Sequence, residues 1–387
     1  GLRRHGVAGV IVPVANAAEM ALVRNLAVYP VRDLREAAAV LASGGKGWQR
    51  AGTPDSSALL ADESPGDSDW SDIAGQGHVK RALEVAVAGA HNVLLSGPPG
   101  AGKTMFARRL PGIMPPLTLD EAIAVTRVHS VAGSLPAGAG LVTRRPLRAP
   151  HHTISSVGLV GGGATPRPGE VSLAHLGVLF LDEFPEFRLS ALEGLRQPLE
   201  DGDVTISRAL TSVCFPARIM LVAAMNPCPC GYLGDGERPC TCPGYRVRQY
   251  RSRLSGPLLD RIDLRIEVPR LAPEERRALD LAETSAAVRM RVTSARERQR
   301  ARLRGTGASA NAHMTVRHVR RLCRLEPAAI ELLDRAYAGL RLSARACDRV
   351  VKVAQTIADL AAAETVAREH VAESLSYRLL GDDGRLA

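Results

Sequence analysis

Aromatic residues are scarce in this chain of 387 residues, where phenylalanine, tryptophan and tyrosine together make up 3%. Proteins that bind single strands by stacking use aromatic side chains as platforms for the bases. We therefore expect any contact with nucleic acid to fall mainly on the phosphates. The chain also lacks an apolar run of about 18 residues, the length that spans a bilayer, and we expect no membrane partner.

Cysteine is infrequent as well, and its distribution is uneven. Four of the seven cysteines lie within 15 positions, from Cys228 to Cys242. This clustering is more typical of a metal site in a reducing compartment than of a disulfide framework, so we expect a cytoplasmic protein. The charge is also unbalanced: 50 Lys and Arg against 40 Asp and Glu give a net charge of +10. Such an excess favours a polyanionic partner, of which nucleic acid is the commonest.

The first 69 residues divide into a short structured piece and a linker. The chain begins at Gly1 instead of Met, and we expect a processed or truncated form. Residues 1–43 predict two strand and helix pairs, at 7–12, 16–26, 28–31 and 34–41, which are too short to enclose a core alone. Residues 44–69 are rich in Gly, Ser, Asp and Pro without periodicity, which predicts a linker.

Strand and helix patterns alternate from residue 70 to 272 and give way to helices alone from 273 to 387. The alternation predicts a parallel sheet with helices on both faces, an α/β fold, with strands at 93–95, 178–181, 219–224 and 264–268. Residues 131–169 are too long and glycine-rich for an ordinary connection and predict a functional insertion. The later helices, predicted at 273–303, 316–323, 327–340, 344–362 and 368–379, form the kind of subdomain that covers a bound nucleotide as a lid.

A glycine-rich turn follows the first of these strands and opens a helix. Its residues are Gly97, Pro98, Pro99, Gly100, Ala101, Gly102, Lys103 and Thr104. Backbone N–H groups and the helix dipole converge on such a turn and bind anions. In this P-loop pattern the lysine reaches the β- and γ-phosphates of a nucleotide and the Thr hydroxyl binds Mg²⁺. The turn therefore predicts an ATP site with Mg²⁺.

Polar residues follow two later strands at the sheet edge where ligands bind. Asp182 and Glu183 end the strand at 178–181, so Asp182 is expected to hold Mg²⁺ with Thr104, and Glu183 to polarise the attacking water. Asn226 follows the strand at 219–224 and is suited to orient water or touch the γ-phosphate. A purely structural turn is the competing interpretation of Asn226.

Three further residues are candidates around the nucleotide. Gln76 belongs to a turn before a helix at 79–88, and that turn can lie against the adenine base. Arg261 stands between acids in the stretch 258–263, and we predict that it enters a neighbouring subunit's site as a planar cation; a surface ion pair is the alternative. Arg345 opens a lid helix and is a second candidate, with a solvated helix surface as its alternative.

The clustered cysteines form two C-x-C pairs, Cys228 with Cys230 and Cys240 with Cys242, separated by nine residues. Tetrahedral zinc takes four thiolates, and the Pro and Gly flanks let a short loop wrap an ion. The usual ligand pairs have C-x-x-C spacing, so free thiols or a redox disulfide stay open beside zinc.

Taken together, these motifs resemble the YifB/ComM family of AAA+ ATPases, which are Mg-chelatase-like proteins. The stretches that carry the resemblance are 72–76, 97–104, 148–152, 181–183, 225–228, 258–263 and 343–345. The resemblance implies a P-loop AAA+ αβα sandwich over 70–272, including the four-Cys loop at 228–242, and a helical lid domain over 273–387. It also implies that residues 1–43 are the end of a truncated Lon-protease-like (S5-like) domain.

The resemblance further implies Walker A, Walker B, sensor 1, arginine finger and sensor 2 roles for the residues named above, in a homo-hexameric ring. ComM proteins are described as branch-migration helicases in natural transformation, so the implied partners are single-stranded or branched DNA, with recombination proteins as further candidates. Pore hairpins in such rings contact the DNA backbone, so Arg208 in the predicted hairpin at 204–215 is a candidate DNA contact. Further candidates in the insertion are Arg148, His151 and His152. The alternative is that the two histidines stabilise their own loop. The run of arginines from 289 to 304 is either a second phosphate patch or a solvated helix face.

Two other functional classes fit the same motifs. One is a chaperone-like ATPase that remodels proteins, as the magnesium chelatase ATPase subunit does, and the other is a regulatory ATP-binding switch. The basic charge and the scarcity of aromatic residues favour DNA, because protein-threading pores usually present an aromatic residue.

Overall fold

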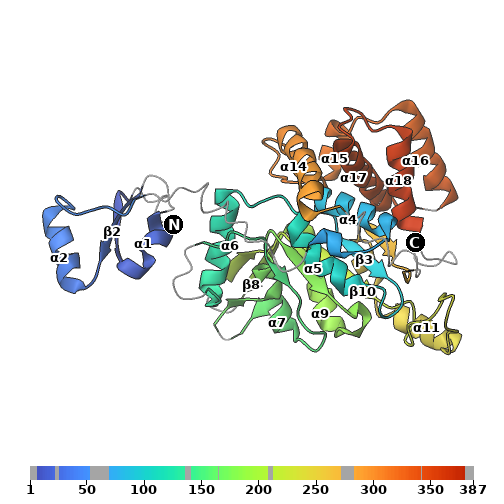
Figure 1. Cartoon of the computed structure of the whole chain (residues 1–387), viewed down its shortest axis with the longest axis horizontal. Coiled ribbons are helices and arrows are strands. Elements are labelled where there is room, and N and C mark those ends of the chain that lie inside the picture. Colours follow the sequence, from blue (N-terminus) through green and yellow to red (C-terminus); the bar gives the residue numbers. More distant parts are fainter. Residues whose placement is uncertain are drawn as a thin grey trace. The chain divides into compact units, whose positions relative to one another are not determined.

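The computed structural model describes residues 7–21, 26–52, 69–135, 141–163, 165–207, 212–271, 283–340 and 342–379. The chain forms two compact units, each described here by itself (Figure 1). Unit 1 comprises Gly1–Ser64 and Pro116–Arg144, and unit 2 comprises Pro65–Pro115 and Arg145–Ala387. Among the described helices, none combines the length and the apolar character needed to cross a bilayer.

Unit 1 contains the strand and helix pairs predicted near the N-terminus. The strands β1 (Gly9–Pro13) and β2 (Ala27–Val31) pair in parallel, and the helices are α1 (Val14–Ala21), α2 (Leu34–Ser43) and α6 (Leu119–Ala132). Asp33 caps α2 by accepting a hydrogen bond from the backbone N–H of Glu36. Thr118 and Glu121 form a reciprocal capping box that starts α6.

Unit 2 is built on a parallel sheet with the strand order β11-β3-β10-β7-β4. These strands are β11 (Leu264–Glu267), β3 (Val93–Ser96), β10 (Met220–Met225), β7 (Val178–Leu181) and β4 (Leu147–Arg148). The predicted strands are confirmed to within one residue, but the prediction missed β4, which has only two residues and hence almost no periodicity. Register pairs Met225 with Ser96 and Ala223 with Leu181, so β3, β10 and β7 end at the same edge.

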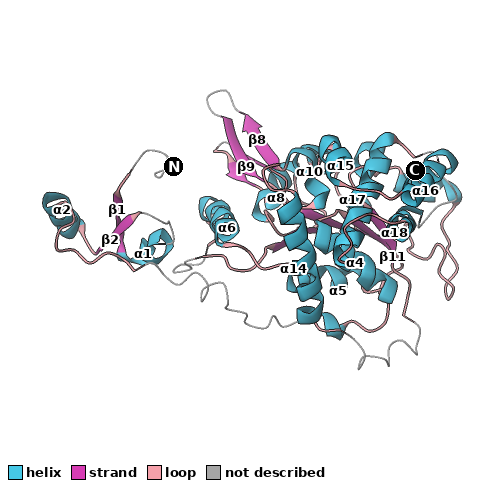
Figure 2. Cartoon of the chain, turned by 90° about the horizontal axis from the view of Figure 1, so that it is seen from above, coloured by secondary structure: helices cyan, strands magenta, loops and turns pink. Residues whose placement is uncertain are grey.

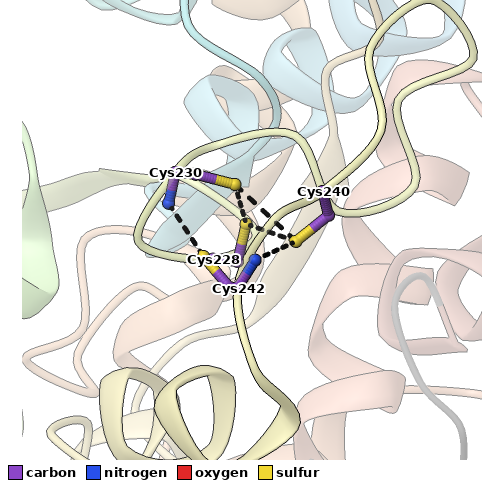
Figure 3. Close-up of side chains that lie close together, drawn as sticks. All are labelled: Cys228, Cys230, Cys240 and Cys242. Atoms are coloured by element: carbon purple, nitrogen blue, oxygen red, sulfur yellow. Dashed lines mark hydrogen bonds between the residues drawn. The ribbon is translucent and has the colours of Figure 1, made fainter.

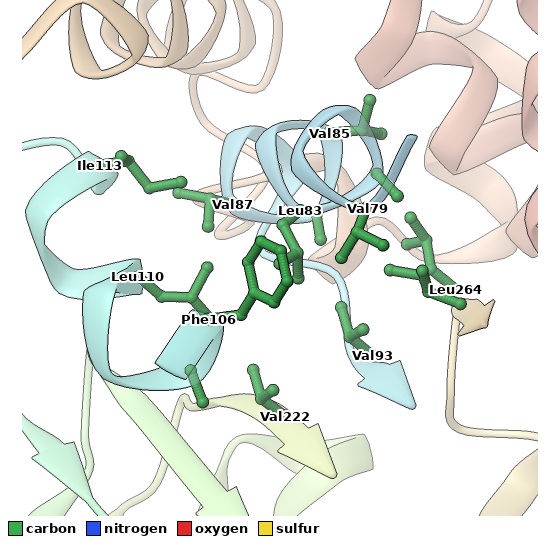
Figure 4. Close-up of a cluster of buried hydrophobic side chains, with 14 of the residues drawn as sticks. Val79, Leu83, Val85, Val87, Val93, Phe106, Leu110, Ile113, Val222 and Leu264 are labelled. Atoms are coloured by element: carbon green, nitrogen blue, oxygen red, sulfur yellow. The ribbon is translucent and has the colours of Figure 1, made fainter. Parts of the chain in front are cut away.

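Each face of this sheet has its own apolar core because side chains alternate along a strand. Val93 and Leu95 of β3 belong to one core, and Leu94 belongs to the other. The first core packs the sheet against α4 (Gly77–Gly89) and α5 (Lys103–Ile113), with the fully buried Phe106 among Leu83, Leu110 and Val222 in Figure 4. This packing fixes α5 against β3 and thereby holds the turn that joins them.

The C-terminal helices form a bundle in unit 2 (Figure 1), and four of the five predicted helices are confirmed. The helix predicted over 273–303 begins only at Ser285, where Thr284 caps it, and residues 273–282 lie outside the described residues. The helices of the bundle are α14 (Ser285–Arg302), α15 (Val316–Leu322), α16 (Pro327–Gly339), α17 (Ala344–Leu360) and α18 (Arg368–Leu379). The bundle has its own core, which includes Ala336, Val350, Ala354 and Val371. Helices α14 and α17 both contact α4, which joins the bundle to the sheet layer.

Shorter elements complete unit 2. The second core is covered by α7 (Ser156–Val160), α9 (Leu189–Gly194) and the hairpin of β8 (Asp203–Ser207) and β9 (Ser212–Pro216). The hairpin confirms the predicted alternation and stands out from the sheet in Figure 2. The other elements are η2 (Trp70–Asp72), β5 (Gly161–Gly162), β6 (Arg167–Pro168), α8 (Glu170–Leu173), η3 (Phe184–Glu186), α10 (Arg196–Asp201), α11 (Gly244–Arg251), α12 (Gly256–Leu259) and η5 (Asn311–His313).

Candidate nucleotide site and cysteine cluster

The turn between β3 and α5 has the backbone geometry of an anion cradle. Gly102 caps α5 at a φ of 91°, in the left-handed region that favours glycine. Gly97 lies against the end of β11, where a Cβ atom would come within 2.1 Å of the carbonyl oxygen of Val268. The two glycines therefore let the turn bend and pack closely while α5 points its N-terminus, and its free N–H groups, toward the turn.

The Lys103 side chain folds back over this turn and reaches the next strand. Its Nζ donates to the carbonyl oxygens of Gly97 at 2.6 Å and Pro98 at 2.9 Å, and to Oδ1 of Asn226 at 3.1 Å. Burial lowers the pKa of Lys103 to about 8, although the nearby charge of Asp182 opposes that shift. The structure thus brings the predicted phosphate-binding lysine and the predicted sensor amide into direct contact.

Thr104 and Asp182 also meet, as expected of a Mg²⁺ site. The Thr104 hydroxyl donates to Oδ2 of Asp182 across 2.7 Å, from the start of α5 to the end of β7. A hydroxyl and a carboxylate are oxygen ligands of the type that Mg²⁺ accepts. The residues present therefore fit the ion, which would neutralise phosphate charge at this sheet edge.

Glu183 has an unusual backbone conformation and an unexpected partner. Its φ of 53° lies in the left-handed region, which a residue other than glycine adopts rarely and at a cost. Its Oε2 lies 2.9 Å from Nδ1 of His152, and the His152 ring stacks on that of His151 with centroids 4.1 Å apart. Sequence reasoning placed both histidines in the insertion without linking them to Glu183, because β4, which delivers them to this edge, was missed.

Gln76 connects the turn to the end of β11. Its Nε2 donates to the carbonyl oxygens of Ala101 at 3.2 Å and Pro269 at 2.6 Å, while its Oε1 is buried without a hydrogen-bond partner. The predicted adenine-side residue is therefore part of the same site.

The two predicted arginines differ in their surroundings. Arg261 is tied within its own chain, since its Nε donates to the carbonyl of Arg196 at 3.1 Å, Nη1 donates to that of Pro257 at 2.7 Å, and Nη2 pairs with Glu200. Arg345 lies exposed in the first turn of α17. Arg261 is therefore held by contacts within its own chain, whereas Arg345 is exposed.

The residues predicted to contact DNA lie in different surroundings. Arg148 forms a two-point ion pair with Glu170, at 2.5 and 2.8 Å, which occupies its charge within the chain. His151 bonds to the Thr153 hydroxyl of its own loop at 3.0 Å, as the alternative interpretation expected. Arg208 lies outside the described residues, between the described parts of β8 and β9.

The arginine run of α14 lies largely at the junction between the helical bundle and the sheet layer. Arg296 donates to the carbonyls of Val87 and Ala88 at 2.7 and 3.0 Å, and Arg302 pairs with the buried Asp359 at 2.6 Å. Arg291 pairs with Glu84 at 2.6 Å. These three arginines bind other parts of unit 2, so the run as a whole is not a solvated face, although Arg298, Arg300 and Arg304 are exposed.

The four clustered cysteines converge in space, as Figure 3 shows. Their sulfur atoms all lie within 4.8 Å of one another, and Sγ of Cys228 is 3.4 Å from that of Cys230 and 3.6 Å from that of Cys240. Tetrahedral zinc with Zn–S bonds of about 2.3 Å separates its ligands by roughly 3.8 Å, whereas a disulfide bond measures about 2.05 Å. The spacing fits a shared metal ion, and all four are free cysteines.

Backbone groups favour a thiolate at Cys230, whereas burial and the neighbouring cysteines raise the pKa of Cys242 and, against the Cys242 N–H, that of Cys240 to about 12. The N–H groups of Tyr232 and Thr241 lower the pKa of Cys230 to about 6. The N–H of Cys230 also donates to Sγ of Cys242 at 3.3 Å, and that of Cys242 to Sγ of Cys240 at 3.4 Å. A thiolate is the form of cysteine that ligates metals.

Comparisons with known proteins agree with this arrangement. A family model described as magnesium chelatase, subunit ChlI, matches residues 69–276, and the model for its C-terminal part matches residues 282–378. An uncharacterized protein of Mycobacterium tuberculosis is 44% identical over 382 residues, which cover 98% of this chain and 74% of the relative. Competence protein ComM of Haemophilus influenzae is 47% identical over 314 residues, covering 81% of this chain and 60% of ComM. YifB of Salmonella typhimurium is 40% identical over 376 residues, covering 96% and 71%.

Proposed function

Because the chain belongs to the YifB/ComM family of Mg-chelatase-like AAA+ ATPases, we propose that it uses ATP hydrolysis to drive branch migration of DNA during natural transformation. The observation that carries the ATPase part is the convergence of Lys103 with Asn226, and of Thr104 with Asp182, at one sheet edge. The likeness to a competence protein and the net charge of +10 support DNA as the substrate. A cytoplasmic location and recombination proteins as further partners belong to the same proposal.

Each polar residue at the sheet edge has a defined part in hydrolysis. The backbone of the turn and the charged Lys103 bind the phosphates, and Thr104 with Asp182 would hold Mg²⁺. Glu183 accepts a proton from the attacking water, and His152 orients its carboxylate through the 2.9 Å contact. Asn226 positions that water or the γ-phosphate.

We assign Arg261 to the site of the neighbouring subunit in a homo-hexamer. A planar, permanently charged guanidinium stabilises the negative charge that develops on the transferred phosphoryl group. To do so, Arg261 exchanges its contact with Glu200 for the neighbour's nucleotide. Arg345 senses the nucleotide from the lid helix α17, where it is exposed.

A mixing experiment tests the shared site. Arg261→Ala and Lys103→Ala subunits are each expected to be inactive alone, while a mixture regains part of the ATPase activity because some interfaces pair an intact Lys103 with an intact Arg261. Each variant alone, at the same total protein concentration, is the control. A mixture as inactive as its parents would remove Arg261 from the role in trans.

DNA dependence separates the proposed motor from a protein remodeller. We expect a four-way DNA junction to raise ATP turnover and to be branch-migrated, with affinity falling as salt rises because phosphate contacts release counterions. The Glu183→Gln variant should bind the junction without migrating it. If DNA leaves ATP turnover unchanged, the result favours the chaperone-like protein remodeller over the DNA motor. The magnesium chelatase family model supports that alternative.

The hairpin of β8 and β9 is the DNA-binding element that we propose. It stands out from the sheet layer (Figure 2), and Arg208 belongs to its connecting segment. An Arg208→Ala variant is expected to lower junction affinity and the salt slope while leaving DNA-independent ATP turnover intact.

Zinc is the ion that we propose for the four cysteines. Their sulfur spacing fits a tetrahedral site, and this is the donor set typical of structural zinc. Elemental analysis is expected to find one zinc per chain, whereas protein carrying only reactive thiols would favour the redox alternative.

A further inference from the structure

The four-Cys loop begins where the nucleotide site ends. Asn226, whose side chain contacts Lys103, is separated from the first proposed zinc ligand, Cys228, by one residue, Pro227. From Asn226 to Pro243 the backbone forms neither helix nor strand, and only Cys228 and Gly231 are buried among its 18 residues. Such a segment buries too little apolar surface to offset the conformational entropy lost when it is ordered.

The backbone of this loop presses directly on the P-loop. Gly231 has a φ of 86°, and a Cβ atom there would lie 2.6 Å from Cδ of Pro99 and 3.8 Å from Cγ of Asn226. A side chain at position 231 would therefore clash with Pro99, and it would touch Asn226 at an ordinary contact distance. The position of Gly231 sets how tightly Pro99 and Asn226 are held.

The cysteine cluster determines the position of Gly231. Gly231 follows Cys230 directly, and its N–H donates to the carbonyl oxygen of Cys228 at 3.0 Å. It therefore sits inside the turn that joins two of the four sulfur ligands. A metal bound by those ligands would lock the turn that touches Pro99.

Arg270 and Arg251 supply further anchors for the loop, and Arg251 donates to the carbonyl of Pro227 at 3.3 Å. Arg270 pairs with Asp235 at 3.1 Å and with the exposed Glu237 at 3.0 Å, and it lies 5.6 Å from the centre of the Tyr232 ring. The pair with the exposed Glu237 and the cation–π contact each contribute only about 1 kcal/mol or less, whereas the Asp235 side chain is only 5% exposed and its pair is the firmer anchor. The contacts of Arg270 reach residues between Tyr232 and Glu237, which follow the turn from Cys228 to Gly231 in the chain.

We propose that zinc in the cysteine cluster holds Gly231 against Pro99 and Asn226, so that binding of ATP depends on a metal that does not touch the nucleotide. This inference rests on the proposed zinc site and on the ATP site, and it is independent of DNA. It makes the four-Cys loop a structural support of the P-loop. Loss of zinc would therefore loosen Asn226 and the adjacent backbone together.

The test measures zinc content and nucleotide binding separately. Zinc is quantified in the purified protein, and the affinity for a fluorescent ATP analogue with Mg²⁺ is measured before and after removal of zinc by a chelator that is then dialysed away. Losing a charge-assisted hydrogen bond corresponds to a loss of roughly tenfold to hundredfold in affinity. We expect a loss of that size, and recovery when zinc is added back.

Three variants identify the cause. Cys240→Ser is expected to lose zinc and to bind the analogue weakly even when zinc is added, whereas Cys214→Ser, at an exposed cysteine of β9 outside the cluster, should behave as the wild type. Gly231→Ala should keep its zinc and still bind ATP weakly, because its Cβ meets Pro99. Circular dichroism confirms that each variant is folded.

The outcomes separate the inference from the proposals beneath it. Protein without zinc that binds ATP normally would overturn both the zinc site and its role. Protein with zinc whose affinity is unchanged by zinc removal, or a Gly231→Ala variant with wild-type affinity, would overturn the coupling alone and leave the ATPase proposal intact.

Discussion

The charge of Lys103 makes ATP binding sensitive to alkaline pH. Burial lowers the pKa of this amine to about 8, against an ordinary value of about 10.4. Roughly nine-tenths of the amines are then charged at about pH 7 and roughly one-tenth at about pH 9. Phosphates attract the charged form, so bound ATP raises the pKa, and by linkage ATP affinity falls as the pH rises through the lower value.

The expected size of the effect follows from these fractions. If the bound state keeps Lys103 charged throughout, the affinity falls by about tenfold between about pH 7 and pH 9, which equals about 1.4 kcal/mol. The assay is a titration with a fluorescent ATP analogue and Mg²⁺ at a series of pH values. Glu183→Gln protein is used so that hydrolysis does not consume the ligand.

A neutral replacement provides the control for this prediction. Lys103→Met removes the titrating amine, so its weaker binding should not decline over the same interval. Equal affinity of the lysine protein at about pH 7 and pH 9, or an equal decline in Lys103→Met, would refute the assignment of the pH effect to a desolvated Lys103.

Three other predictions concern catalysis and stability. Glu183→Gln is expected to abolish ATP turnover while leaving ATP-dependent assembly, measured by light scattering, and normal turnover would remove Glu183 from its role. Arg349→Met removes the guanidinium 2.5 Å from the buried Asp263, which keeps His91 and the N–H of Asn92, and should lower the free energy of unfolding by about 3 kcal/mol. Adding Asp263→Asn should recover part of this loss, and additive losses in denaturant melts would contradict the pairing. Phe106→Ala opens a cavity in the core between α4, α5 and the sheet. The free energy of unfolding should fall by about 3–5 kcal/mol in the same melts. A fall below about 1 kcal/mol would mean that this core does not hold the turn at Lys103.

Local patterns predicted most of the elements and the residue types of the site. The P-loop turn, the acids after β7, the hairpin of β8 and β9 and the C-terminal helices are visible in the chain because each depends on neighbouring residues. Two-residue β4 has too little periodicity to detect. Its absence from the prediction is why His152 was not associated with Glu183.

Contacts between distant residues required the tertiary structure. The arginines of α14 illustrate the limit, since a run of charges has the same pattern whether it faces solvent, DNA or the buried Asp359. Arg148 and Arg261 show the same limit, because their partners Glu170 and Glu200 lie 22 and 61 positions away in the chain.

Local patterns in the chain are enough to predict a P-loop nucleotide site, a parallel sheet, a helical C-terminal part and a cluster of four cysteines. The tertiary structure alone decided which residues meet: Lys103 with Asn226, Glu183 with His152, and Gly231 with Pro99. Secondary structure and motifs follow from the spacing of nearby side chains, whereas contacts across strands follow from the order β11-β3-β10-β7-β4, which local spacing does not specify.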